Sequence, residues 1–164
     1  MTLNQLTSTD LAYIAGFVDG NGCINAQIVR RRDYVLGFQI RVSITFFQKT
    51  SRHWFLLQLH KQLGYGTVRK RPDGISEYAV VGSSGVNNLL VVLLPFLRLK
   101  KRQAQLLLEI IDTLSKAQDP QAFGKLCEMV DTITDLNDSK KRILRASVVR
   151  SELGLDSDYI PRRD

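Results

Sequence analysis

The sequence predicts an α+β fold with the element order α-β-β-α-β-β-α, followed by further helices. Two observations predict it. Residues 35–47 alternate apolar and polar side chains, which is the period of a half-buried strand. Pro72-Asp73-Gly74 separates two short strand-like runs, which indicates a β-hairpin. A chain of 164 residues is long enough for one domain with a full hydrophobic core, and no repeat or linker divides it.

The first unit begins at a helix N-cap. Thr7-Ser8-Thr9-Asp10 combines capping residues with an acid in the first turn, so a helix is predicted over 11–20. Residues 23–29 are predicted to pair antiparallel with the strand at 35–47. Alternation in the longer strand separates apolar residues, Phe38, Ile40, Val42, Ile44 and Phe46, from polar residues, Gln39, Arg41, Ser43 and Thr45. This strand therefore has one buried face and one face that is free to form hydrogen bonds.

The second unit is predicted to repeat this order. Thr50 or Ser51 is expected to cap a helix with large apolar side chains, which ends at Gly64-Tyr65-Gly66. Strands at 67–71 and 75–81 then form the second hairpin.

Helices are predicted to fill the rest of the chain. Their expected spans are 84–94, capped by Ser84 and disturbed at Pro95; 99–117; 120–136, opened by Asp119-Pro120; and 140–153, capped by Asn137-Asp138-Ser139. The last of these helices is basic at its start. Residues 154–164 are expected to be a loosely held tail, which leaves 1–153 as the single domain.

The composition favours an acidic partner. Lysine and arginine number 23 against 16 acids, which gives a formal net charge of +7 and a pI near 9.6. Nucleic acid is favoured over membrane because no strongly amphipathic basic helix stands out, and no apolar run is long enough to cross a bilayer. Residues 1–10 contain no lysine or arginine, so neither a signal peptide nor a transit peptide is expected. Cys23 and Cys127 lack zinc-ligand spacing and are expected to be small packing residues.

Small residues lie along the predicted first helix, at Ala15, Gly16 and Gly20. They permit close packing against another backbone, either within the chain or in a second copy of it. A helix ends with free carbonyls and the negative end of its dipole, so a carboxylate beside the carbonyl of Gly20 would form an oxygen-rich site suited to Mg²⁺. Two such helices side by side would bring two metal sites near two phosphodiester bonds.

The stretch Ile14-Ala15-Gly16-Phe17-Val18-Asp19-Gly20-Asn21-Gly22 closely resembles the LAGLIDADG motif of homing endonucleases. Three further stretches, at 46–55, 95–104 and 136–140, resemble the single-motif, intron-encoded subfamily. The resemblance covers roughly residues 10 to 150 in the same order of elements. It is therefore much more specific than the nine-residue motif.

The resemblance implies a homing-endonuclease fold and a homodimer that pairs through the helix at 11–20. Saddle-shaped antiparallel sheets would lie in the major groove of a long, nearly palindromic site in double-stranded DNA. Cleavage would occur across the central minor groove with Mg²⁺ as cofactor. Such proteins serve intron homing, commonly from group I introns of chloroplasts or mitochondria, and no membrane partner is implied.

The resemblance also implies roles for particular residues. The metal ligands would be the carbonyl of Gly20 and the side chain at Asn21, and the residues around the scissile phosphate would be Gln48, Arg52 and Lys100. At position 21 the family has an aspartate, whereas this chain has an asparagine, which offers a neutral oxygen in place of an anion. We therefore expect a protein that binds its DNA and cleaves it poorly or not at all, through either a natural loss or a deliberate substitution.

The DNA is expected to be read from the polar strand faces and the first hairpin loop. The predicted reading residues are Gln27, Gln39, Arg41, Ser43, Thr45, Arg69, Arg71 and Glu77, with Arg30, Arg31, Arg32, Asp33 and Tyr34 of the loop at the outer base pairs. The residues expected to touch phosphate are Asn137, Ser139, Lys140, Lys141 and Arg142.

Two alternatives stay open at the level of sequence. A member of the same family could be a non-cleaving DNA-binding protein, or an RNA maturase that helps an intron to fold; RNA is read by shape and stacked loops rather than by major-groove edges. A generic basic domain with an accidental motif is the third interpretation, and it predicts a monomer.

Overall fold

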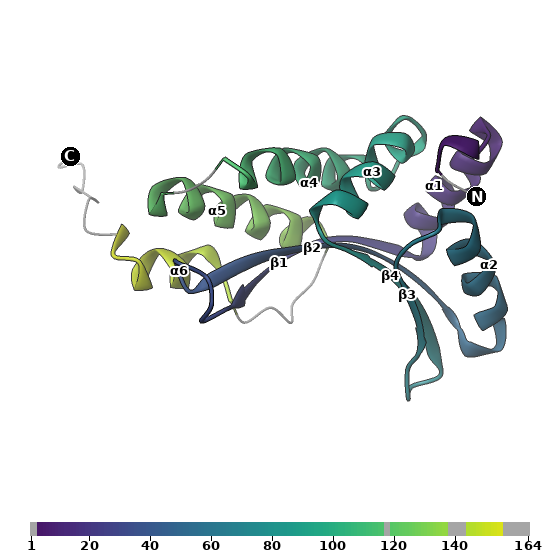
Figure 1. Cartoon of the computed structure of the whole chain (residues 1–164), viewed down its shortest axis with the longest axis horizontal. Coiled ribbons are helices and arrows are strands. Elements are labelled where there is room, and N and C mark those ends of the chain that lie inside the picture. Colours follow the sequence, from purple (N-terminus) through teal and green to yellow (C-terminus); the bar gives the residue numbers. More distant parts are fainter. Residues whose placement is uncertain (1–2, 117–118, 138–143, 156–164) are drawn as a thin grey trace.

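The computed structural model describes residues 3–116, 119–137 and 144–155, and it has the predicted α+β architecture. Helices pack over one face of a four-stranded antiparallel sheet with strand order β1-β2-β4-β3. Figure 1 shows the sheet arching beneath α3, α4 and α5, with both hairpin ends extending away from these helices. The strands are β1 (Gly22–Arg30), β2 (Phe38–Lys49), β3 (Thr67–Lys70) and β4 (Ile75–Val81).

Helices occupy the remaining elements of the described chain. They are α1 (Ser8–Asn21), α2 (His53–Leu63), α3 (Ser83–Leu93), α4 (Lys101–Leu114), α5 (Pro120–Leu136) and α6 (Ala146–Glu152), with short 3₁₀ turns at Leu3–Gln5, Thr50–Arg52 and Leu94–Phe96. No described helix is both long and apolar enough to cross a membrane.

The predicted N-cap of α1 is confirmed, although the helix begins at Ser8, three residues before the predicted start at residue 11. The Asp10 amide donates to Thr7 Oγ1 at 3.1 Å, and the Thr7 amide donates to Asp10 Oδ2 at 2.9 Å, so the two residues form a capping box. Asp119 is the N-cap of α5, and its side chain accepts a 2.8 Å hydrogen bond from the Ala122 amide.

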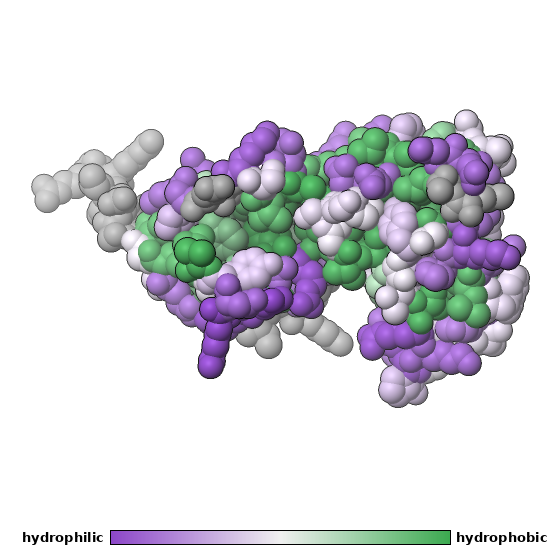
Figure 2. Space-filling view, viewed as in Figure 1, coloured by the Kyte–Doolittle hydropathy of each residue, from purple (hydrophilic) through white to green (hydrophobic). Residues whose placement is uncertain are grey.

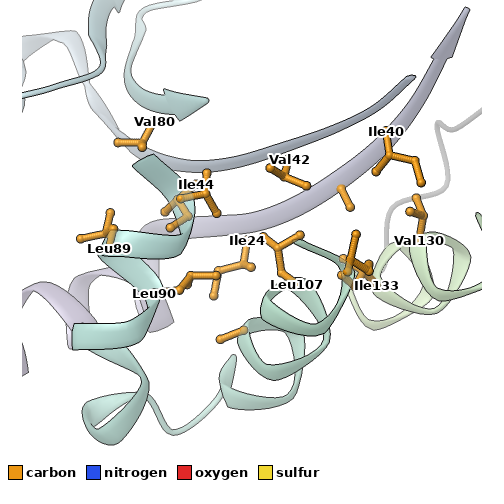
Figure 3. Close-up of a cluster of buried hydrophobic side chains, with 14 of the residues drawn as sticks. Ile24, Ile40, Val42, Ile44, Val80, Leu89, Leu90, Leu107, Val130 and Ile133 are labelled. Atoms are coloured by element: carbon orange, nitrogen blue, oxygen red, sulfur yellow. The ribbon is translucent and has the colours of Figure 1, made fainter. Parts of the chain in front are cut away.

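The core lies between the sheet and the helices. Gly22 pairs with Phe46 and Arg30 with Phe38, so even-numbered residues of β1 and β2 share one face. Figure 3 shows side chains from this face, among them Ile24, Val42 and Ile44, meeting side chains of α3, α4 and α5. The odd-numbered face is left as the concave surface of the arch, so the predicted division into a buried and a polar face is confirmed.

Several predicted element starts were wrong. The first hairpin differs because of its own turn, and the others because of a contact with another element. At the first hairpin, Gly37 turns with φ of 77° and its amide bonds the Tyr34 carbonyl, so β2 begins at Phe38. Thr50 does not cap α2; it starts a 3₁₀ turn, and its hydroxyl accepts a bond from buried Ser76 at 3.2 Å. Ser84 does not cap α3, which begins directly after Gly82, whose amide bonds Val42 of β2.

The last predicted helix also begins later than expected. Residues 144 and 145 are not helical, and α6 starts at Ala146, where the Asp131 carboxylate of α5 accepts from the Ala146 amide at 3.2 Å. Burial raises the pKa of Asp131. Beyond α6, Leu155 is buried and would contact any Cβ added at Gly124, and residues 156–164 lie outside the described part of the chain.

Both cysteines are free thiols. Cys127 is buried within α5, and burial raises its pKa to about 12. Cys23 lies half-buried opposite Thr45. The Cys127 thiol is poorly suited to bind a metal, because a thiolate is the ligand form of cysteine.

Candidate nucleic-acid interface and metal site

The end of α1 is tied to the segment that precedes α4. Asp19 Oδ2 accepts from the Arg98 amide at 2.9 Å, and Asp19 Oδ1 accepts from the Lys100 amide at 3.0 Å. Both carboxylate oxygens are therefore engaged with backbone donors. These bonds hold residues 98–100 out of the helix, which explains why α4 begins at Lys101 rather than at the predicted residue 99.

Lys100 supplies a cation to the carbonyl end of α1. Its Nζ donates to the carbonyls of Val18, at 2.8 Å, and of Asp19, at 3.2 Å, and also to the carbonyl of Gly22. Free carbonyls at a helix C-terminus form the negative end of the dipole, so an ammonium group is stabilised there. The sequence interpretation put Lys100 near the scissile phosphate, and the structure puts it within hydrogen-bonding distance of the motif helix.

The oxygen donors proposed for a metal are neutral. Gly20 and Asn21 are exposed at the end of α1, and they offer a carbonyl and an amide oxygen. The neighbouring carboxylate of Asp19 is occupied by two amides, and Lys100 places a positive charge on the adjacent carbonyls. Within residues 3–116, 119–137 and 144–155 no group of three or more His, Cys, Asp and Glu side chains could hold a metal. Because Mg²⁺ prefers anionic oxygen ligands, these residues fit it poorly.

Gln48 and Arg52 are brought together at the start of α2. Arg52 Nε donates to Gln48 Oε1 at 2.7 Å, and that oxygen also accepts from the Lys49 amide at 3.1 Å. Gln48 lies two residues beyond Phe46, which pairs with Gly22 directly after α1. The register therefore places the Gln48–Arg52 pair at the same end of β2 as the end of α1.

The predicted reading residues of the strands share the concave face. Gln27 pairs with Arg41, and Ser43 and Thr45 follow at the same parity along β2. In the β3–β4 hairpin, Arg69 pairs with Glu77 on the same face. Six of the eight predicted strand residues therefore lie on the concave face. Gln39, also an odd-numbered residue of β2, lies on the same face next to the first hairpin loop. Arg71 lies just beyond β3, where its amide bonds the Ile75 carbonyl.

Two polar residues on this face were missed. Asn25 lies opposite Ser43, and Thr67 lies opposite Ala79, which in turn is opposite Thr45. Counting by two from Gln27 would have found Asn25, since the side chains of a strand alternate between faces. Thr67 could be predicted only with knowledge of the strand order, because β3 and β2 are joined only through β4.

The first hairpin divides its charged residues between two sides of the sheet. Arg30 has the parity of the buried face, and it forms a two-point ion pair with Glu152 of α6, with Nη1–Oε2 at 2.8 Å and Nη2–Oε1 at 2.6 Å. The structure thus separates Arg30 from the other predicted reading residues. Arg31 bonds Asp33 and Gln39 within the hairpin, while Arg32 and Tyr34 are exposed in the turn.

The second hairpin concentrates charge around Glu77. Its carboxylate accepts from Arg69 Nε, and Arg71 Nη1 lies 3.8 Å from Glu77 Oε2. Glu77 is 14% exposed in its side chain, whereas Arg69 is 66% exposed. The acid therefore sits beneath two guanidinium groups and orients them.

Asn137 joins the C-terminal helices to the sheet. Its Nδ2 donates to the Ile24 carbonyl at 2.7 Å, on the free edge of β1. The side chain thus holds α5 against the strand rather than standing free for phosphate. The other predicted phosphate contacts, Ser139, Lys140, Lys141 and Arg142, lie outside the described residues.

One side of α1 has no cover in the described chain. Ala12, Gly16 and Gly20 lie exposed along it, and a Cβ at either glycine would meet no described neighbour within 4 Å beyond the helix's own backbone. Beside this stripe, large apolar side chains are also exposed, namely Tyr13 at 63%, Trp54 at 61% and Leu57 at 49%. Tyr13 and Trp54 both pack edge-on against Phe55, so they form one continuous surface.

Comparison with known proteins gives a consistent result. A model of the LAGLIDADG endonuclease family matches residues 14–111. The DNA endonuclease I-CvuI of Chlorella vulgaris is 51% identical over 139 residues, which cover 85% of this chain and 86% of the relative. The DNA endonuclease I-CreI of Chlamydomonas reinhardtii is 42% identical over 144 residues, which cover 87% of this chain and 88% of that protein.

Solved structures share this fold. A crystal structure of I-CvuI in complex with its target, in the presence of Ca, matches with a TM-score of 0.85 and 48% identity, over 90% of this chain and 94% of that one. A second I-CvuI structure, with the I-CreI target in the presence of Mg and the DNA not cleaved, matches equally well. The archaeal endonuclease I-Vdi141I, at 21% identity and a TM-score of 0.78, covers 90% of this chain and 96% of its own, and it shows the likeness of fold alone.

Proposed function

The chain belongs to the LAGLIDADG endonuclease family, and from this premise we propose that it binds a long, nearly palindromic site in double-stranded DNA as a homodimer. The observation that supports it most is the concave face, where amide, hydroxyl and guanidinium side chains alternate at strand spacing. Such a ribbon fits a major groove, in which each base pair presents a distinct pattern of donors and acceptors. I-CvuI, with a TM-score of 0.85 to this chain, is itself seen bound to its target.

The uncovered side of α1 supports the homodimer. Glycines with no described neighbour allow a second helix backbone to approach closely, and the adjoining Tyr13, Trp54 and Leu57 would lose water on contact. A twofold pairing would also place two concave faces in a row along the duplex, which matches a nearly palindromic site. A dimer doubles the formal charge of +7, so binding should weaken steeply with salt.

Cleavage is the part of the family activity that this chain is poorly equipped for. At the end of α1, Asn21 and the Gly20 carbonyl are neutral and the Asp19 carboxylate is occupied, so these residues offer no free anion. Gln48, Arg52 and Lys100 remain as the residues proposed to surround the scissile phosphate. We therefore expect specific binding with weak hydrolysis or none, and we assign the missing Mg²⁺ affinity to the lost charge at position 21.

A pair of experiments tests this proposal. Selection of bound duplexes from a random pool should yield one nearly palindromic consensus, and ultracentrifugation of the complex should show two subunits on each duplex. With that duplex as substrate, Asn21→Asp should produce Mg²⁺-dependent double-strand cleavage at least about 100-fold faster than the unchanged chain, the scale expected for a charged group at a reaction centre. Equal cleavage by both proteins would refute the assignment to Asn21.

Competition separates the alternatives within the family. The selected duplex should displace structured RNA from the protein, because the alternating polar face suits base edges in a major groove. Preferential retention of RNA would instead favour the maturase. A role in intron homing and a location in a chloroplast or mitochondrion stay predictions of the family resemblance.

A further inference from the structure

Both hairpins of the sheet end in the same three-residue arrangement. Arg31-Arg32-Asp33 closes the β1–β2 hairpin, and Arg71-Pro72-Asp73 closes the β3–β4 hairpin. In each, the carboxylate binds the guanidinium group two residues before it. Figure 1 shows the two hairpin ends extending from the sheet on the side away from α3–α5, and Figure 2 shows hydrophilic residues gathered at both.

The Arg31 guanidinium is fixed from three directions. Nε and Nη2 donate to the two Asp33 oxygens at 2.9 and 2.7 Å, Nη1 donates to Gln39 Oε1 at 3.1 Å, and the group lies over the Tyr34 ring at 5.2 Å from its centroid. An arginine has five N–H donors, so donors on Nη1 and Nη2 remain for a ligand. The usual entropy cost of ordering an arginine on binding is already met by these contacts.

Arg71 is held by fewer contacts, but the corresponding aspartate is again among them. Its Nη2 lies 2.6 Å from Asp73 Oδ2, and its Nη1 lies 3.8 Å from Glu77 Oε2. Asp73 is itself fixed, because its second oxygen accepts from the Ile75 amide at 3.1 Å. The aspartate is thus part of the turn, and the arginine takes its orientation from it.

Pairing changes what these arginines can bind. A guanidinium beside a carboxylate has little net charge for a phosphate, which any duplex offers, but it keeps oriented N–H donors. The guanine edge in the major groove presents two acceptors, O6 and N7, that suit such donors. Arg41 of the concave face differs, since it makes no side-chain hydrogen bond or ion pair with any described residue.

We propose that Asp33 and Asp73 determine specificity by orienting Arg31 and Arg71 toward guanine and by cancelling the charge that would bind phosphate at any sequence. This inference rests on the proposed DNA-binding function and adds to it a role for acids at a basic surface. The Arg31 side chain lowers the pKa of Asp33, so the acid is ionised at neutral pH and the pair is maintained there.

The main test compares Asp33→Asn and Asp73→Asn with the unchanged protein. Asparagine keeps the shape of the turn and one acceptor but frees the arginine's charge. Affinity for a scrambled duplex should rise about tenfold, and the slope of log affinity against log salt should steepen by about 1.8 for a dimer, or about 0.9 for each subunit. Selection from a random pool should show weaker guanine preference at one symmetric pair of positions.

A charge-matched control lies on the helix layer. Asp112→Asn removes an acid of α4 that pairs at 3.3 Å with Lys116 in the turn after this helix. Asp112 is far from the hairpins in sequence, and its side chain is 75% exposed. It should change neither slope nor base preference. The double variant Arg31→Ala with Asp33→Ala removes a neutral pair, so guanine preference should fall while the salt slope stays the same.

Two outcomes would overturn the inference. One is an unchanged slope and base profile in Asp33→Asn and Asp73→Asn, and the other is retained guanine preference in the double variant. Thermal melting of each variant verifies folding, which these exposed positions should not disturb. If the unchanged protein selects no duplex at all, the proposed function fails instead, so the two failures are distinguishable.

Discussion

The concave face of the sheet carries many residues suited to binding DNA, whereas the end of α1 carries few residues suited to binding a metal. The sheet spreads donors, acceptors and cations over four strands, so each contact adds a fraction of the affinity for DNA. The end of α1 depends on a few atoms at one point, and there Asn21 supplies no charge while Asp19 is occupied. We therefore expect DNA binding to tolerate a change at position 21 that would remove the proposed metal-dependent cleavage, because distributed contacts tolerate the loss of one member.

The largest loss of DNA affinity is expected from a change on the uncovered side of α1. Pairing of two α1 helices would bring together both concave faces and both ends of α1. Gly16→Leu would leave the fold intact, since a side chain there meets no described neighbour, but it would hold a second α1 away. We expect a monomer in ultracentrifugation and a loss of DNA affinity of more than about 100-fold, because half of the contacts are lost.

Gln105→Leu is the matched control, because it adds the same side chain at an exposed position of α4. It should leave both assembly and binding unchanged. A dimeric Gly16→Leu protein with normal affinity would contradict the pairing of α1 helices and would leave the sheet face to act alone.

A smaller effect is expected on the sheet side of the comparison. Arg41→Ala removes a guanidinium group on the concave face, opposite Gln27, that pairs with no described side chain. Affinity for the selected duplex should fall about 10- to 100-fold, as expected for loss of one base or phosphate contact in each subunit. Fluorescence anisotropy titrations would measure this, with Lys116→Ala in the turn after α4 as a control of equal charge. Equal losses in both variants would point to net charge alone.

The smallest effect on DNA binding is expected for a change at the end of α1 that acts on stability instead. Asp19→Asn would turn an amide group toward the Arg98 or Lys100 N–H, which weakens two bonds that join α1 to the start of α4. The free energy of unfolding should fall by about 1–3 kcal/mol in urea titration. Affinity for DNA should change little, and a large loss of binding would show that Asp19 touches the duplex.

Local signals in the sequence predicted much of the fold. The N-cap at Thr7 with an acid at Asp10, the Asp119-Pro120 helix start and the Pro72-Asp73-Gly74 turn each lie within a few residues, and each is found in the structure. The alternation along β2 likewise predicted which side chains would be buried. These features depend on backbone geometry and on neighbours close in sequence, so a single chain is enough to identify them.

Other features of the candidate site depend on residues that are far apart in the chain. Arg30 was grouped with the reading loop, but Glu152, 122 positions away, binds it on the opposite side of the sheet. Asn137 was expected at phosphate, but it bonds the carbonyl of Ile24. The sequence shows a charged or polar side chain in each case and cannot show its partner, because long-range pairs form only after packing.

The sequence by itself determined the α+β class, the family motif and the asparagine at position 21, because composition, periodicity and residue identity are local properties. Tertiary structure decided which arginines stand free and which are held by acids, and where helices begin when their caps come from other elements, as at Ala146. The physical reason is that the neighbours of a charged group in space decide whether it is paired or free to bind a ligand. Only the folded chain brings those neighbours together.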